Sequence, residues 1–329
     1  MAARASARKS RAIHFSVSRF TARPEAPSLI FLALLIVALS ASTPEFATVA
    51  NLRGVLEQVA VVSIVALAVN QVVLAGEIDV STGSLVAVCS FIYGDVATAH
   101  GEAWLALLAA LMTGAVVGSI NGALATYGRV PSIIATIGML FILRGIVLLT
   151  AGAQVINLSA DSRLFGAGTN FGIPTSLIVL ATMFIAMYAL SEHSAFGRDV
   201  YAIGGNPRAA RTVGLPIYRV RWLTFVLSGL SCGLAAAVLL GQIGQLQATA
   251  ATGFELKVIA AIVLGGTRIT GGRGSNASPV IGAVLVGVIL NALTLNRVPG
   301  SYELLVLGAL ILGAVAFDGC RQRLLGRGR

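Results

Sequence analysis

Two carboxylates interrupt an otherwise apolar part of the chain. Glu77 and Asp79 lie in the segment GEIDVSTGS (76–84), which also holds three hydroxyl side chains and two glycines. Carboxylate and hydroxyl oxygens at this spacing can hold a proton or a cation. The glycines favour a break in any helix that includes them. The chemistry of the segment therefore depends on what surrounds it.

The rest of the chain offers little catalytic chemistry. The three cysteines (Cys89, Cys232, Cys320) and three histidines (His14, His100, His193) are scattered, with no CxxC or HExxH spacing, so neither a metal site nor a disulfide framework is expected. No nucleophile and base converge in the pattern, so we do not expect an enzyme. Neither of the two lysines, Lys9 and Lys257, ends a GxxxxGK[ST] phosphate loop. Any ATP must therefore be bound by a partner, and we expect no cofactor on this chain.

Composition points to a membrane. Of the 329 residues, 57% are hydrophobic and only 11% are charged, and the mean hydropathy is +0.89. A soluble domain carries about 25% charged residues. The apolar stretches lack a two-residue alternation, which indicates helices and not barrel strands. We therefore predict an all-α, polytopic bundle in the cell (inner) membrane.

Ten spans can be placed along the sequence. The third and the eighth are short and interrupted by glycine. Their approximate bounds are 27–45, 54–75, 82–98, 103–126, 132–150, 173–190, 222–242, 255–267, 278–293 and 301–317.

Basic residues predict the orientation. If both termini are cytoplasmic, 18 of the 23 Lys and Arg residues fall on the cytoplasmic side. The net charge of +10 is then an orientation signal that requires no nucleic-acid partner. Residues 1–26 form a basic tail, 27–318 the transmembrane domain and 319–329 a second basic tail. A signal peptide is the alternative for the N-terminus, but its apolar run continues past Leu39, which favours a retained first helix.

Polar residues inside or beside the predicted spans are candidates for a functional role. An ionisable group at membrane depth costs about 2.5–3.5 kcal/mol on translocon scales, so it is a functional hypothesis by default. Broken helix at this depth is tolerated where it lines a cavity. We predict that Asp79 and Ser81 lie near the inner end of a translocation path; an ordinary cytoplasmic turn is the alternative. The remaining candidates for the path are Asn70, Gln71, Asn121 and Thr136, for which hydrogen bonding between helices is the alternative.

An inverted repeat is a further possibility. Residues 121–131 read NGALATYGRVP, and 291–299 read NALTLNRVP. Five spans separate the two segments, so they would lie at opposite sides of the membrane, as in many transporters. Chance similarity of so short a match is the alternative.

The longest cytoplasmic loop, 191–221, predicts a short helix. Asn206 is a suitable N-cap, Pro207 suits the first helical position, and Gly214 suits the end. The helix is either an interfacial or topology-setting element, or a docking element for a soluble partner. The candidate docking residues are Tyr201, Gly204, Gly205, Asn206, Ala209, Ala210 and Gly214.

Four long motifs occur in order and resemble a known family. They are EIDVSTGS (77–84), GSINGALATYGRVPSIIATIGMLFILRG (118–145), GRDVYAIGGNPRAARTVGL (197–215) and GFELKVIAAIVLGGTRITGGRGS (253–275). The chain resembles the permease subunits of carbohydrate ABC importers of the ribose, xylose and galactoside type. The resemblance implies a second permease subunit, identical or paralogous, two cytoplasmic ATPase subunits and an extracytoplasmic sugar-binding protein. It also implies that the third motif contains the coupling helix.

Two departures from the family pattern bear on the solute. Lys257 stands where many sugar permeases have an acidic or neutral residue, and Phe-Asp-Gly follows at 317–319. Both lean toward the branch that imports rhamnose or the autoinducer-2 signal. A stand-alone, ion-coupled secondary transporter is the alternative function, with Glu77 and Asp79 as its ion sites.

Overall fold

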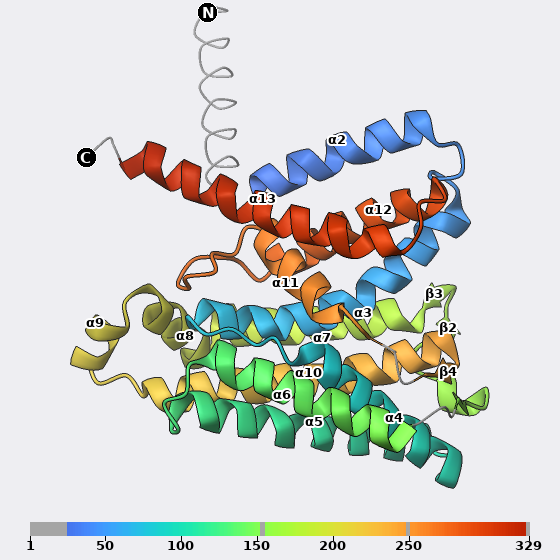
Figure 1. Cartoon of the computed structure of the whole chain (residues 1–329), viewed down its shortest axis with the longest axis horizontal. Coiled ribbons are helices and arrows are strands. Elements are labelled where there is room, and N and C mark those ends of the chain that lie inside the picture. The colour runs from blue at the N-terminus through green and yellow to red at the C-terminus, as the bar shows by residue number, and fades with distance from the viewer. Residues whose placement is uncertain (1–24, 152–154, 248–250, 327–329) are drawn as a thin grey trace, which may run out of the picture.

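The computed structural model describes residues 25–151, 155–247 and 251–326, and within them the chain is almost entirely helical. Two short antiparallel strand pairs, β1 (Ile156–Asn157) with β4 (Gln245–Leu246) and β2 (Thr169–Asn170) with β3 (Ile173–Pro174), gather at one end of the helices (Figure 1). The helices are α2 (Ala26–Ser42), α3 (Val49–Leu74), α4 (Thr82–His100), α5 (Ala103–Thr126), α6 (Ser132–Ala151), α7 (Thr175–His193), α8 (Ala195–Gly205), α9 (Pro207–Thr212), α10 (Ile217–Ile243), α11 (Phe254–Leu264), α12 (Ser278–Leu295) and α13 (Ser301–Gly326), with a 3-10 turn at Asp161–Arg163.

A helix stands at each of the ten predicted spans. Seven of those described, α3 to α7, α10 and α12, are long and apolar enough to cross a membrane. The apolar parts of α2 and α13 are shorter, and α11 has only 11 residues. The all-α, polytopic architecture is confirmed, while the number of complete crossings stays a prediction. Most of the predicted basic tails, 1–26 and 319–329, lies outside the described residues.

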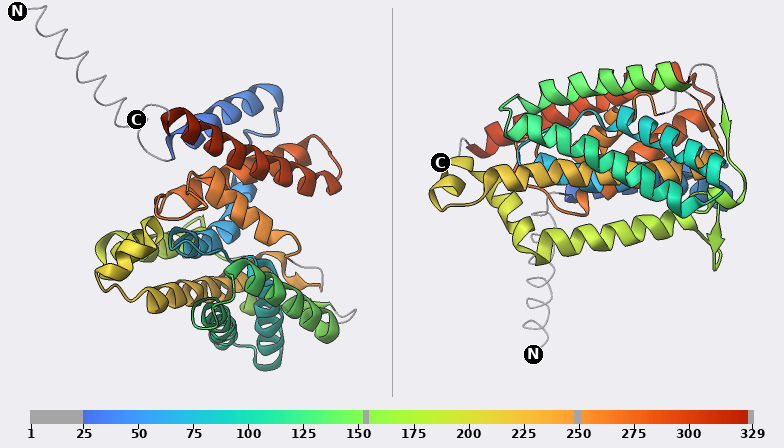
Figure 2. Two further views of the ribbon diagram at one scale, coloured as in Figure 1. Left: turned by 60° about the vertical axis from the view of Figure 1, so that its left-hand side comes forward. Right: turned by 90° about the horizontal axis from the view of Figure 1, so that it is seen from below.

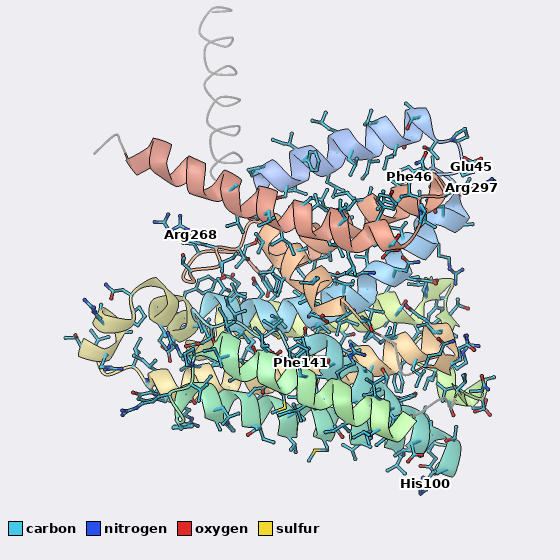
Figure 3. All side chains as sticks on the ribbon, viewed as in Figure 1. Glu45, Phe46, His100, Phe141, Arg268 and Arg297 are labelled. Carbon is cyan, nitrogen blue, oxygen red and sulfur yellow. The ribbon has the colours of Figure 1, made fainter. Side chains whose placement is uncertain are left out.

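One end of the bundle gathers arginines, because α8 carries Arg198 and α9 carries Arg208 and Arg211. Arg268 lies at the end that carries α8 and α9, called here the α9 end, and Arg297 lies at the opposite end (Figure 3). The chain's α13 also finishes toward the α9 end (Figure 1). This arrangement fits the predicted orientation, although the side of the membrane that each end faces stays a prediction.

The helices form two groups, one on each side of α3. One group holds α4, α5, α6 and α10, and the other holds α2, α11, α12 and α13, with α3 between them (Figures 1 and 2). Each group contains a contact between the two halves of the sequence. In the first group α10 lies along α5, and α3 lies along α12 of the second group. The helix α7 lies along one edge of the bundle (Figure 2).

Close helix contact explains the glycines of α5. A Cβ atom added to Gly114 would lie 2.1 Å from the carbonyl oxygen of Gly229 in α10, and one added to Gly118 would lie 2.4 Å from that of Phe225. Small residues at this spacing let two membrane helices approach until their backbones touch. The glycine pair Gly114 and Gly118 therefore permits the close approach of α5 to α10.

The two similar segments have the same local geometry. Arg129 and Arg297 each adopt a left-handed backbone with φ of 55°. Each follows the end of a helix and precedes Val-Pro and the start of the next helix, α6 or α13. The first segment lies at the α9 end and the second at the opposite end (Figures 1 and 3). These features support the inverted repeat.

The outer helices expose apolar side chains, as a membrane protein requires. On α6 these include Phe141, which is 69% exposed and points away from the bundle near its middle (Figure 3). Such an apolar surface must be covered by lipid hydrocarbon or by a neighbouring subunit. The chain is a multi-pass membrane protein.

Candidate functional site

The segment between α3 and α4 is extended and lies inside the bundle. The backbone N–H of Ile78 donates to Ser132 Oγ at 3.2 Å, and that of Val80 donates to Thr136 Oγ1 at 3.2 Å. From Ile78 to Val80 the extended chain rises about 6.6 Å. From Ser132 to Thr136 the helix rises about 6 Å, so the two pairs of groups are in register. The α6 hydroxyls therefore satisfy backbone groups that would otherwise be unpaired at membrane depth.

Asp79 is enclosed in a hydrogen-bond network, and its side chain is 1% exposed. One carboxylate oxygen accepts bonds from the backbone N–H of Ser81 (3.0 Å) and the Ser81 hydroxyl (2.7 Å). The other accepts a bond from Ser228 Oγ of α10 at 2.8 Å. Asn121 Nδ2 of α5 donates to Ser81 Oγ at 2.9 Å. The network fastens the extended segment to α5 and α10.

The structure thus brings four predicted residues together: Asp79, Ser81, Asn121 and Thr136. The sequence reading missed Ser228, because one serine in a small-residue helix carries no recognisable signal. It also missed the ion pair between Glu77 and Arg221, which lies closer to the α9 end. With both acids of the segment partnered, neither lies in open solvent in this conformation.

Asn70 and Gln71 belong to a separate group. Asn70 accepts a hydrogen bond from Thr267 Oγ1 at 2.8 Å and donates to the carbonyl of Ser275 at 3.2 Å. Gln71 donates to Ser191 Oγ of α7 at 2.8 Å. These residues fasten α3 to α7 and to the loop that follows α11. In this conformation they bond helices together, as the alternative interpretation had it.

The loop 191–221 folds into two short helices, α8 and α9. The Asn206 side chain accepts hydrogen bonds from the backbone N–H groups of Arg208 (3.1 Å) and Ala209 (3.0 Å), which confirms it as the N-cap of α9. Pro207 holds the first helical position, and Gly214 follows the helix with φ of 79°. The predicted short helix is therefore confirmed, and it ends at Thr212.

Only part of the predicted docking set is exposed. Gly205, Asn206, Ala209 and Gly214 face outward. Ala210 was expected on the contact surface, but it is 4% exposed and packs with Leu74, Val200 and Ile203. The six-residue helix α9 turns one face toward the bundle, and Ala210 is the buried residue on that face. The exposed face carries Arg208 and Arg211 beside Ala209.

Tyr201 and Gly204 hold α8 against the bundle. Tyr201 Oη donates to the carbonyl of Gly274 at 3.4 Å. Burial raises the pKa of Tyr201 to about 12, and the charges of Glu192 and Glu25 add to the shift, so the hydroxyl stays a donor. A Cβ atom on Gly204 would lie 1.7 Å from the carbonyl oxygen of Leu74. Both residues therefore position the docking helices.

A glycine turn after α11 completes this junction. Gly271 and Gly272 adopt φ of 85° and 72°, a conformation that favours glycine. The backbone N–H of Gly272 donates to Leu74 O at 2.9 Å, and a Cβ atom there would lie 2.5 Å from Gly205. The turn joins the end of α11 to α3 and α8, a contact that no sequence signal disclosed.

Comparison with known proteins adds to this geometry. Residues 51–315 match the family described as "Branched-chain amino acid transport system / permease component". The chain belongs to this permease family. The match covers more than half of the sequence. Its bounds also include both hydrogen-bond groups and the α8–α9 pair.

Relatives of the chain are named as permease proteins. The ribose import permease of Escherichia coli K12 is 35% identical over 91% of this chain and 94% of its own length. The L-arabinose ABC transporter permease of Azospirillum brasilense is 32% identical over 89% and 87%. The autoinducer 2 import permease of Salmonella typhi is 34% identical over 90% and 85%.

These matches confirm the predicted class. The permease is a transport subunit of the ABC importer type and not an enzyme, and the family works in general with an ATPase and a binding protein. They give no support to a stand-alone, ion-coupled carrier. Among the described residues no cluster of His, Cys, Asp and Glu could hold a metal ion. Lys257, the departure noted in the sequence, forms an ion pair with Glu303 at 3.3 Å.

Proposed function

We propose that the permease forms, together with a second permease subunit, the path of a sugar or sugar-like solute. An extracytoplasmic binding protein delivers the solute, and ATPase subunits bound at the α9 end drive the import. The solute class rests on the relatives named for ribose, L-arabinose and autoinducer 2. The family description names branched-chain amino acids instead, so a hydrophobic amino acid is the competing solute class.

One observation carries the proposed coupling: α8 and α9 stand outside the long helices yet are fastened to them. α9 presents Arg208 and Arg211 on its exposed face, which suits electrostatic steering of an acidic protein surface. Its inner face packs through Ala210 in an apolar cluster that also holds Ile203 of α8 and Leu74 of α3. A push on α9 would therefore be passed to the long helices.

The proposed path includes the polar network around Asp79. Ser81, Asn121 and Thr136 supply hydroxyl and amide groups that suit a solute rich in hydroxyls. Asp79 itself has 1% exposure, so access to it requires α5 and α10 to separate during transport. Asn70 and Gln71 are assigned to the inner end of the same path.

Reconstitution tests the proposal. The permease is purified with its co-purifying subunits, placed in proteoliposomes with the binding protein, and supplied with ATP. Uptake of radiolabelled D-ribose, L-arabinose and L-leucine is measured with and without ATP. We expect ATP-dependent uptake of a sugar and none of leucine. Uptake that persists without ATP and follows an ion gradient would contradict an ABC importer, and leucine uptake alone would overturn the solute class.

A further inference from the structure

Two helices begin near the middle of the bundle. α11 has 11 residues, about 16 Å of helix, and the hydrocarbon core is about 30 Å thick. Its last turn leads to the Gly271–Gly272 turn, which is hydrogen-bonded to Leu74 of α3 and packs closely on Gly205 of α8 at the α9 end. The first residue of α11 therefore lies about half-way across the membrane. α4 also starts inside the bundle, because the extended segment 77–81 returns from the α9 end before the helix begins.

The first turns of these two helices touch each other. A Cβ atom added to Gly83 of α4 would lie 1.9 Å from Glu255 Oε2 of α11 and 3.1 Å from the carbonyl oxygen of Ala251. The Glu255 carboxylate thus rests against the first turn of α4, where free backbone N–H groups and the helix dipole favour a negative charge. A side chain at position 83 would displace the Glu255 carboxylate from this contact.

Several polar atoms at this contact have no partner. Glu255 Oε2 is buried without a hydrogen bond among the described residues, and so are the hydroxyls of Thr82 and Ser84, which flank Gly83. Both hydroxyl residues are fully buried. Buried polar atoms are nearly always hydrogen-bonded, so an unbonded carboxylate oxygen of α11 beside a helix start that holds two unbonded hydroxyls indicates a place for water or a polar solute.

Glu255 is an acidic residue placed at mid-depth. The residue is only partly buried, and a charged group at mid-depth faces a polar cavity or another subunit, not hydrocarbon. The nearest cation in sequence, Lys257, is paired with Glu303. From α6, Arg144 donates to Ala251 O at 3.5 Å and so lies against the same entry segment.

We propose that Glu255 is the mid-membrane contact of the permease for its hydroxyl-rich solute. The carboxylate accepts a hydrogen bond from a hydroxyl group of the passing sugar. Between passages Glu255 rests on Gly83 and keeps the first turns of α4 and α11 together, which closes the path. The inference rests on the proposed function and adds a specific residue and a specific closed contact.

Transport measurements test the role of Glu255 in the complete complex. D-ribose and L-arabinose serve as probes in proteoliposomes with the binding protein. We expect Glu255→Ala to lower uptake about tenfold or more, the equivalent of one lost hydrogen-bond contact of about 1.4 kcal/mol, while stimulation of ATP hydrolysis by the binding protein persists. Glu255→Gln keeps one acceptor oxygen, so its uptake should lie between that of Glu255→Ala and that of the wild type. The matched control is Glu57→Gln, which removes another partly exposed acid, paired with Arg53, and leaves uptake unchanged.

Three results separate the explanations. Unchanged uptake by Glu255→Ala in a complex whose wild type imports sugar overturns this inference and leaves the proposed function intact. A parallel loss of uptake and ATPase stimulation in both Glu255 variants also overturns it, because the residue would then only hold the fold. Absence of ATP-dependent uptake by the wild type contradicts the proposed function itself.

Thiol labelling decides the geometry without relying on the solute. Glu255→Cys and, as a control, Val258→Cys, a fully buried position, are made in a chain with Cys320→Ser. A membrane-impermeant thiol reagent is applied to the assembled complex without nucleotide and with ATP. Labelling of Glu255→Cys in either state, with Val258→Cys silent, supports a water-filled path at this depth. Failure to label Glu255→Cys in both states overturns the inference.

Discussion

Replacing Gly204 by alanine should uncouple the ATPase from the transmembrane helices. The new Cβ atom would lie 1.7 Å from the carbonyl oxygen of Leu74 and 2.7 Å from the backbone nitrogen of Gly272. Both neighbours are backbone atoms at the junction of α3 and the Gly271–Gly272 turn, so neither can rotate away. Ordinary contact begins near 3.4 Å, and α8 must therefore shift by more than about 1.5 Å.

The energetic cost follows from two losses. Overpacking at a closely packed site costs about 1–3 kcal/mol, and loss of the 2.9 Å bond from Gly272 N to Leu74 O costs about 1 kcal/mol. The sum of about 2–4 kcal/mol corresponds to a factor of about 30 to 1000 in the population of the correctly docked junction. Stimulation of ATP hydrolysis by solute-loaded binding protein should fall accordingly, and import should fall with it.

Gly54→Ala is the control. It adds the same methyl group in α3, outside the docking residues, where no atom lies within 4 Å. ATPase rates with and without loaded binding protein, import, and the recovery of the ATPase on purification are measured for both variants. Equal behaviour of the two variants would refute the close packing of α8 as the basis of coupling.

Three other experiments test the remaining claims. Ser194→Cys should resist an impermeant thiol reagent added outside intact cells while Ser301→Cys reacts; labelling of Ser194→Cys from outside would reverse the orientation. Asp79→Asn weakens up to three hydrogen bonds, worth about 1.5–3 kcal/mol each when charged, so uptake and the unfolding temperature in detergent should both fall, and unchanged values would remove the network from the site. Gly229→Ala places a methyl group 2.0 Å from Gly114 O and should lower the unfolding temperature, whereas Gly138→Ala, with nothing within 4 Å, should not; equal temperatures would contradict the tight contact of α5 and α10.

Local signals in the sequence predicted much of this protein. Apolar runs gave the positions of the ten helices, because a segment in hydrocarbon must satisfy its own backbone. The cap at Asn206 and the stop at Gly214 were readable because helix ends depend on a few adjacent residues. The break at 76–84 was visible because acids and glycines rarely follow one another in a span.

Contacts between distant segments were decided only by the tertiary structure. That Ser228 bonds Asp79, that Ala210 faces the bundle, and that Glu255 meets Gly83 across 172 positions of sequence all depend on how helices cross. A small or polar residue on a membrane helix carries the same sequence signal whether it faces lipid, a neighbouring helix or a path. The sequence by itself therefore determined the class of protein, its helices and the order of its motifs. Which side chains meet was decided by close packing in three dimensions, because the partner of each residue lies on a helix that no local rule identifies.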